Sequence, residues 1–361
     1  MGACHRARVL ELISWDMRRP LLALFSLVPL ACSSSSEEPT QLAGDTGSEV
    51  ADSVAEAATD TGAETTDIFP DVGPTSKFTT GHVFLAGSRN AEVFEFDETL
   101  KLVTHWTDPH FGKVLPFPGQ SLDLGPAGMA FDASGNLVVA GVDSFCVFSA
   151  PNVLVDCHPK IKKQATENVI FDHLGNLYTT TATGGTNEIH KYDSSYTFVK
   201  TFAMPTGEMT GVTCDPTGNL FIGSQLGSGK SQVFKVDRTT LTPTATIPLT
   251  GTVEGLQYAA GDVFWAALQG SIVKVSALPP YTITTTIKDP GLAYAVPLTI
   301  DGAGNVYTSD YENGSGTAAA DIYVWKPDGT LKVSRKATEV WGPFGIVIGG
   351  TRLPCGAFRP L

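Results

Sequence analysis

The chain has 361 residues and a formal net charge of −13 at pH 7. An acidic balance of this size repels a phosphate backbone, so we expect no nucleic-acid partner. The charge is unevenly spread: the first residues are basic, the following segment is strongly acidic and the remainder is mildly acidic.

Residues 1–32 have the pattern of an export signal. The apolar run Leu21–Val28 is too short to cross a membrane as a helix, and two arginines precede it. The run ends in Pro-Leu-Ala-Cys at Cys32, followed by four serines, which resembles the cleavage and lipid-attachment site of bacterial lipoproteins. We therefore expect lipid attachment at Cys32. The alternative is an ordinary secretory signal that is cut near Ala31.

The start of translation is a separate question. Glu11 and Asp16 are unusual in a basic leader, whereas a leader that begins at Met17 would open with a basic stretch. We expect translation to start at Met17, and the intact mass of the unprocessed precursor distinguishes this from a start at Met1.

Residues 33–76 form a second, acidic segment. They contain ten acidic residues and neither lysine nor arginine, and Ala, Ser, Thr and Gly dominate the remainder. Such a segment cannot bury enough apolar surface to offset the entropy of ordering, so we predict a disordered linker. Because its charges repel one another, it should be an extended tether.

A short phrase then recurs and organises the rest of the chain. It is clearest at Gly211–Ile222, where an apolar run ends at an Asp, two residues follow, and Gly-Asn opens a second apolar run. Alternating apolar residues predict strands with one face on a core. The Asp can bond the backbone that follows it and the Gly can adopt positive φ, so we predict a hairpin with a turn-forming, non-catalytic Asp. The clear copies carry Asp132 with Gly135, Asp172 with Gly175, Asp215 with Gly218, and Asp301 with Gly304.

The spacing of these copies predicts the fold. With degenerate copies at Gly261 and Gly349, the turn glycines lie 40 to 45 residues apart. A period near 40 with room for four strands is typical of a propeller blade. The first unit begins at its second strand, His82–Ala86, and the last supplies a single strand, Phe344–Ile348. We therefore predict an all-β, six-bladed β-propeller closed by a C-terminal strand that completes the first blade and leaves no open edge.

The predicted propeller occupies residues 77–353, and residues 354–361 form a C-terminal tail. The expected blades are 81–107 with 342–350, then 125–165, 166–206, 207–250, 251–292 and 293–338.

The sequence Gly125–Leu137 resembles an NHL-type repeat and the blades of the SMP-30/gluconolactonase group. The resemblance covers the whole predicted propeller and implies the six-bladed fold. The enzymes of that group hold a metal ion with a Glu followed by Gly, an Asn followed by Gly, and an Asp within Pro-Asp-Gly. Glu254 matches the first of these, whereas Asn168 is not followed by Gly and Pro297 is not followed by Asp.

The predicted channel mouth carries the candidate binding residues. Counting from the turn, Glu167 and Glu254 stand where the first strand of their blades begins, and Asn168 follows Glu167. These are the oxygen ligands that calcium takes, and carboxylates can also position water for hydrolysis. His110 lies in the long loop 108–123 on the same loop-rich face, where ligands usually bind. The plainer alternative is two solvated acids at a channel mouth.

The cysteines fall into separate groups. Cys146 and Cys157 lie in the third and fourth strands of one predicted blade, so in an exported protein we predict a disulfide between them. Cys214 occupies a column of core residues, which favours a small buried residue over a nucleophile. Cys355 follows the closing strand and has no assigned partner. No Cys-x-x-Cys or His/Cys spacing indicates a zinc site.

Together these features predict a monomeric binding or scaffold protein of the bacterial cell envelope. It is lipid-anchored through Cys32 and presents its loop-rich face to a protein, glycan or small-molecule ligand. We assign it no catalytic residue, metal or cofactor, and no membrane contact besides the anchor. The alternative is a divergent lactonase-like hydrolase that holds calcium with Glu254, Asn168 and Glu167.

Overall fold

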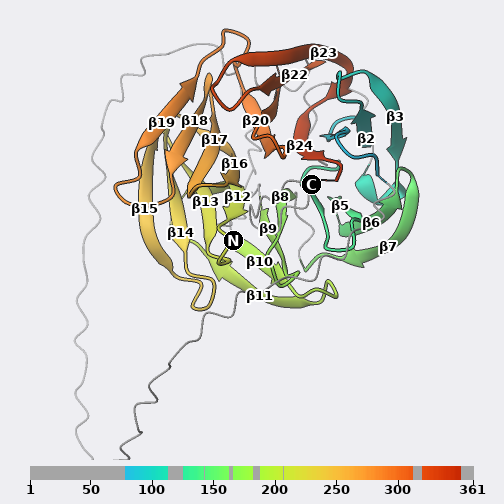
Figure 1. Ribbon diagram of the computed structural model, residues 1–361. Coiled ribbons are helices and arrows are strands. Elements are labelled where there is room, and N and C mark those ends of the chain that lie inside the picture. Colours follow the sequence, from blue (N-terminus) through green and yellow to red (C-terminus); the bar gives the residue numbers. More distant parts are fainter. Residues whose placement is uncertain are drawn as a thin grey trace, which may run out of the picture. The chain divides into compact units, whose positions relative to one another are not determined.

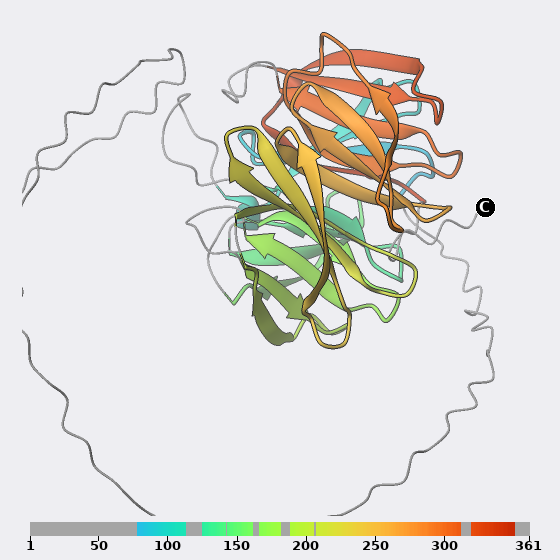
Figure 2. The same ribbon diagram turned by 90° about the vertical axis from the view of Figure 1, so that its left-hand side faces the viewer.

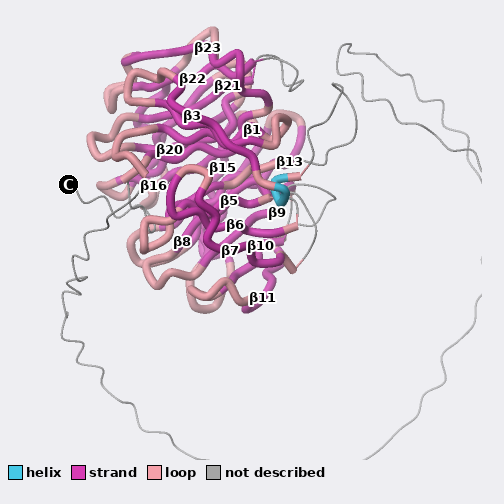
Figure 3. Tube along the Cα trace, turned by 90° about the vertical axis from the view of Figure 1, so that its right-hand side faces the viewer, coloured by secondary structure: helices cyan, strands magenta, loops and turns pink. Residues whose placement is uncertain are grey.

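The computed structural model describes residues 78–112, 125–141, 143–161, 166–181, 188–205, 207–311 and 319–350. The predicted leader with Cys32 and Met17, the linker 33–76 and the tail 354–361 lie outside these ranges. Within them, the regular elements are β-strands and one 3-10 turn, η1 (Pro109–Phe111), which Figure 3 shows in cyan at one end of the strands. The described part of the chain contains no apolar helix of membrane-crossing length.

The strands form six antiparallel sheets of four strands each, which Figure 1 shows around a common centre. Each sheet is strongly twisted, as the side view in Figure 2 shows. The first sheet has the order β24-β1-β2-β3 and contains β24 (Pro343–Ile348), β1 (Val83–Gly87), β2 (Glu92–Phe96) and β3 (Leu102–Thr107).

Within each of the other five sheets, the strands follow the chain order from the centre of the ring outward. The second contains β4 (Met129–Phe131), β5 (Leu137–Ala140), β6 (Ser144–Ala150) and β7 (Val153–Pro159). The third contains β8 (Thr166–Phe171), β9 (Leu177–Thr181), β10 (Glu188–Tyr192) and β11 (Phe198–Ala203). The fourth contains β12 (Glu208–Cys214), β13 (Leu220–Gly227), β14 (Lys230–Val236) and β15 (Pro243–Thr250). The fifth contains β16 (Val253–Ala259), β17 (Val263–Leu268), β18 (Ser271–Ser276) and β19 (Ile283–Ile287). The sixth contains β20 (Ala295–Ile300), β21 (Val306–Tyr311), β22 (Ala319–Trp325) and β23 (Leu331–Trp341).

The innermost strands close the ring. Each innermost strand contacts the next one around the ring, in the order β24, β4, β8, β12, β16 and β20. The last of these, β20, contacts β24 and so closes the circle. In the first blade, Leu85 pairs with Ile346 and Phe84 with Val347, so the C-terminal strand completes the blade that the first strands begin. Val83 and Ile346 share one core cluster with Ile322 of the sixth blade. The predicted fold class, blade number and closing strand are confirmed.

The recurring Asp forms the predicted turn. Oδ1 of Asp172 accepts hydrogen bonds from the backbone N–H of Leu174 and of Asn176, both at 2.9 Å, and Oδ2 accepts one from the Asn176 side chain at 2.8 Å. Gly175 in the same turn has φ +80°. The carboxylate therefore organises the hairpin instead of facing a substrate. The same bonds occur at Asp132, Asp215 and Asp301.

Replacing Asp172 with Ala should lower the free energy of unfolding by about 2 kcal/mol, because the buried Tyr178 hydroxyl and three partly buried N–H donors lose a charged acceptor. Asp172 is buried and also accepts a hydrogen bond from the Tyr178 hydroxyl at 3.1 Å. Urea denaturation measures the change. Asp193→Ala is the matched control, because Asp193 makes a similar turn at the surface and should cost less. Equal losses in the two variants would contradict this account.

The predicted disulfide is confirmed. Cys146 of β6 and Cys157 of β7 are cross-strand partners, and their sulfurs are bonded at 2.10 Å. Cys214 is buried in the core, as predicted, and is disulfide-bonded, which excludes a free nucleophilic thiol. Cys355 lies outside the described residues.

Removing the Cys146–Cys157 link should destabilise the protein. The bond closes a loop with a sequence separation of 11 residues, and in the chain-entropy model a loop of this length contributes about 3 kcal/mol. We expect the double variant Cys146→Ser/Cys157→Ser to lose about this much free energy of unfolding. Denaturation of both oxidised proteins under the same conditions measures the difference, and an unchanged midpoint would contradict the prediction.

Glycines let the innermost strands approach one another. These glycines lie four residues before the turn position of their blades. A Cβ on Gly211 would stand 2.6 Å from the backbone N of Leu256, and a Cβ on Gly255 would stand 2.4 Å from the Val296 carbonyl oxygen. A Cβ on Gly345 would stand 2.0 Å from the Ala127 carbonyl oxygen. The register of the innermost strand with its neighbour also shifts near this position in several blades. Neighbouring innermost strands are therefore packed backbone against backbone around the centre of the ring.

Candidate functional site

The innermost strands surround a small central cavity of about 70 Å³. It has room for a few water molecules, whereas an ordinary small-molecule site needs about 300 Å³ or more. Among the predicted site residues, Asn168 lines the cavity. A larger ligand would therefore have to bind at the end of the channel instead of within it.

The polar end of the channel lies opposite the Asp-Gly turns. Glu208 begins β12 and pairs with Gln225 near the end of β13. Glu254 is the second residue of β16, and Asp310 near the end of β21 pairs with Ala295. Because these positions are all remote from the turns of their hairpins, the fourth, fifth and sixth blades bring three carboxyl groups to the same face. We call this region the mouth.

Glu254 is the most unusual group of the mouth. Only 7% of it is exposed, and burial raises the pKa of its carboxyl to about 7. Hydrogen bonding with Tyr294 and Gln225 opposes this rise in pKa, whereas the charge of Glu208 adds to it. Burial also raises the pKa of the Glu208 carboxyl. Oε1 of Glu254 is buried with no hydrogen-bond partner among the described residues.

Neighbouring groups extend this polar site. The backbone N–H of Tyr294 donates to Oδ2 of the buried Asp310, so the residue that bonds Glu254 also holds a second carboxylate. Thr210 stands in the column of Glu254 in the adjacent blade. Its Oγ1 is likewise buried without a hydrogen-bond partner in the described part of the chain. The mouth therefore offers acceptors that a ligand with N–H, O–H or cationic groups would satisfy.

The other predicted residues have different surroundings. Asn168 on β8 donates through Nδ2 to the Thr210 carbonyl oxygen at 3.0 Å and so ties the third blade to the fourth. Glu167 also lies on β8, but its side chain is outside the described residues. His110 lies in η1 and bonds Asp108 beside the Cys146–Cys157 disulfide. Thus Asn168 and Glu254 belong to the channel and its mouth, whereas the contacts of His110 are with the disulfide of the second blade.

The carboxylates of the mouth do not form a compact metal-ligand cluster. Among the described residues, the group of His, Cys, Asp or Glu ligand atoms close enough to share an ion is the one around His110, and it includes neither Glu208, Glu254 nor Asp310. The calcium set predicted for the lactonase-like alternative, Glu254, Asn168 and Glu167, stays a prediction, because the Glu167 side chain lies outside the described residues.

The sequence did not single out Glu208, Gln225, Tyr294 or Asp310 as binding residues. Counting outward from the turn along the first strand found Glu254. Gln225 lies ten residues after the turn residue Asp215 and Asp310 nine after Asp301, so no single count along the second strand finds both. Tyr294 precedes its strand, and no sequence signal marks it.

Comparisons with known proteins show the fold. No family model matches the chain and no curated protein matches it, so the resemblance to NHL and SMP-30 repeats stays a prediction. A protein of unknown function from Bacteroides caccae is similar at 11% identity and a TM-score of 0.57, covering 74% of this chain and 98% of its own. A chain of a nidogen/laminin complex is similar at 17% identity and a TM-score of 0.57, covering 74% of this chain and 98% of its own. A luciferin-regenerating enzyme is similar at 14% identity and a TM-score of 0.53, covering 72% of this chain and 91% of its own. At these identities the likeness shows one thing, that the chain is a six-bladed β-propeller.

Proposed function

We propose that the protein is a binding module of the bacterial cell envelope, anchored through Cys32 and the linker 33–76, and that its ligand docks at the mouth. The observation that carries this proposal is Glu254, a buried carboxyl with one oxygen that has no hydrogen-bond partner among the described residues. Leaving such a group unsatisfied costs about 1–3 kcal/mol. A bound cationic or hydrogen-bond-donating group would recover that free energy.

The charge of the mouth selects the class of ligand. Glu208, Glu254 and Asp310 come from adjacent blades, and among the described residues neither Glu208 nor Glu254 is paired with a Lys or Arg. An ammonium group, on a small amine or on a lysine side chain of a protein partner, fits three acidic neighbours better than an anion does. We therefore propose an amine-bearing ligand.

Thermal melting of the purified protein tests this proposal with the diamine putrescine as the probe. A ligand that binds the folded state raises the midpoint, so putrescine should raise it for the unaltered protein and should raise it less for Glu254→Gln. Glu98→Gln, which alters an exposed acid outside the mouth, should behave like the unaltered protein. An equal response in all three proteins would exclude docking at Glu254.

A second candidate function is a divergent metal-dependent hydrolase. A carboxyl with a pKa of about 7 suits general acid–base catalysis near neutral pH, which favours Glu254 for that role. The fold is compatible with both functions, since the similar structures include a luciferin-regenerating enzyme and a chain of a nidogen/laminin complex. Lactone or phosphoester hydrolysis that needs calcium and is lost in Glu254→Gln would overturn the binding proposal.

The envelope location is tested separately. The unaltered precursor should incorporate labelled fatty acid and sediment with membranes, and Cys32→Ser should do neither. A soluble, unlabelled product from the unaltered gene would indicate the ordinary secretory signal instead.

A further inference from the structure

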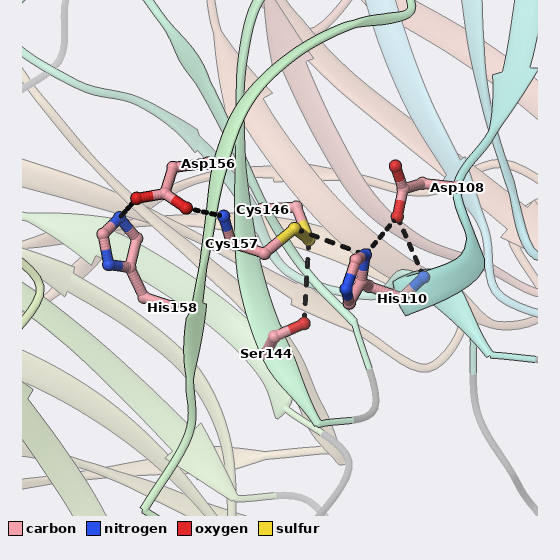
Figure 4. The surroundings of a disulfide bond; sticks show 7 residues. All are labelled: Asp108, His110, Ser144, Cys146, Asp156, Cys157 and His158. Atoms are coloured by element: carbon pink, nitrogen blue, oxygen red, sulfur yellow. Dashed lines mark hydrogen bonds and ion pairs between the residues drawn. A yellow bond between two sulfur atoms is a disulfide. The ribbon is translucent and has the colours of Figure 1, made fainter.

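A second cluster of reactive side chains surrounds the disulfide of the second blade (Figure 4). Nδ1 of His110 lies 2.6 Å from Oδ1 of Asp108 and 3.4 Å from Sγ of Cys157. Sγ of Cys157 is bonded to Sγ of Cys146. One ligand atom from each of these four residues lies within 4.8 Å of all the others. We call these residues the disulfide cluster.

The chain brings the disulfide cluster together from distant segments. Asp108 caps η1 by accepting the His110 backbone N–H at 2.9 Å, and this cap holds the imidazole against the edge of the second blade. Cys146 and Cys157 come from the paired strands β6 and β7. No short sequence motif joins these positions, which is why their spacing did not indicate a metal site.

The surroundings of the disulfide cluster are those of a built site. Phe111 and Phe148 pack against each other in the same core cluster as Cys146. Ser144 lies with its Oγ 3.6 Å from Sγ of Cys146. Cys146 is fully buried, Cys157 is partly buried and His110 is about half exposed. Solvent therefore reaches the cluster from the side of His110 and Cys157.

We propose that reduction of the Cys146–Cys157 bond turns the disulfide cluster into a binding site for one zinc ion. Two cysteine thiolates, an imidazole and a carboxylate are ligands that zinc takes, in a tetrahedron with ligand distances of about 2.0–2.3 Å. Four such atoms around one ion lie about 3–4 Å apart, so the folded blade needs only a small separation of the two sulfurs. Thiolate ligands favour zinc over calcium or magnesium.

The chemistry balances with a thiol as the reductant. Two external thiols become one external disulfide, and Cys146 and Cys157 take up the two hydrogens. Zinc then displaces both thiol protons into solvent and forms two Zn–S bonds. His110 binds through Nδ1 and carries its proton on Nε2, and Asp108 supplies the fourth ligand atom. Oxidation by a disulfide reverses the sequence and releases the ion.

Zinc titration of the full chain tests the proposal, in competition with a chromophoric chelator. The phosphine-reduced protein should bind one zinc ion per chain, and the oxidised protein should bind none at this site. Cobalt(II) in place of zinc should give the strong thiolate-to-cobalt absorption of a tetrahedral site. If reduction unfolds the chain, recovery of the near-ultraviolet circular dichroism on adding zinc is the corresponding readout.

Variants separate this site from the other cysteines. Cys146→Ser/Cys157→Ser keeps Cys214 and the remaining cysteines and should lose the cobalt band. His110→Ala should weaken zinc binding by about 10–100-fold or more, since loss of even an indirect contact to a metal ligand costs that much. His158→Ala is the control, because His158 neighbours Cys157 in sequence but pairs with Asp156 outside the cluster. Zinc binding that survives the double cysteine variant, that ignores His110→Ala, or that is absent from the reduced protein would overturn the proposal.

Discussion

Replacing Gly345 with Ala should destabilise the propeller by about 3 kcal/mol or more, the largest effect that we expect from adding a single methyl group. The new Cβ would stand 2.0 Å from the Ala127 carbonyl oxygen, a distance at which the backbone has to move. Gly345 belongs to the closing strand and Ala127 to the second blade, so the clash falls at the point where the ring closes. Chemical denaturation followed by tryptophan fluorescence measures the loss.

A second glycine variant isolates the cause. Gly261 has φ +82°, but a Cβ there would meet no atom within 4 Å. Gly261→Ala should therefore cost only the conformational strain of a left-handed residue, about 1–2 kcal/mol. If Gly345→Ala costs no more than Gly261→Ala, the close backbone packing at the centre does not limit stability.

Replacing Glu254 with Gln should make the protein more stable at pH 8 by as much as about 3 kcal/mol while leaving it nearly unchanged near pH 4.5. The carboxyl has a pKa of about 7 in the folded protein, against an ordinary value of 4.5. The folded state therefore holds the proton over a range in which the unfolded state has lost it. The stability of the unaltered protein falls as pH rises from about 4.5 to 7, and Gln, which mimics the protonated acid, removes this dependence.

Urea denaturation of both proteins at several pH values between about 4.5 and 8 measures this difference. Comparing the two proteins cancels the titrating groups that do not interact with Glu254. One of these groups is Lys160, whose Nζ donates to the Gly141 carbonyl oxygen at 2.7 Å. Burial lowers its pKa to about 7, so it titrates in the same pH range as Glu254. Glu98→Gln, at an exposed acid outside the mouth, is the matched control. A Glu254→Gln protein that is less stable than the unaltered one at pH 8 would show that the ionised carboxylate is held by favourable contacts.

Local chemistry explains why the architecture could be predicted. The turn at Asp172 depends on residues within six positions of one another, so its Asp, Gly and Asn are legible without the rest of the fold. The disulfide was predictable for the same reason, since Cys146 and Cys157 flank a single hairpin. The closing strand followed from the incomplete first and last units, and its pairing with β1 is observed.

The sites depend on contacts that the chain order hides. Glu254 was found by position, but its raised pKa depends on burial and on Glu208 from another blade. Tyr294, which links Glu254 to Asp310, lies outside the repeated phrase. His110 was expected to join the loop-rich binding face, and the structure places it against Asp108 and Cys157. These relations are between blades or between a loop and a blade, where sequence periodicity carries no information.

The order in which the closing pair is synthesised has a consequence for biogenesis. β1 is among the first described strands to leave the ribosome and β24 is the last, yet the two are direct partners. At about 5–20 residues per second, β1 waits roughly 10–50 s for the strand that covers it. Until then its free edge can pair with other chains, so a nascent molecule needs a holding chaperone, or delivery in an unfolded state to its destination. Truncation just before Pro343 should consequently yield an aggregating product instead of a five-bladed ring.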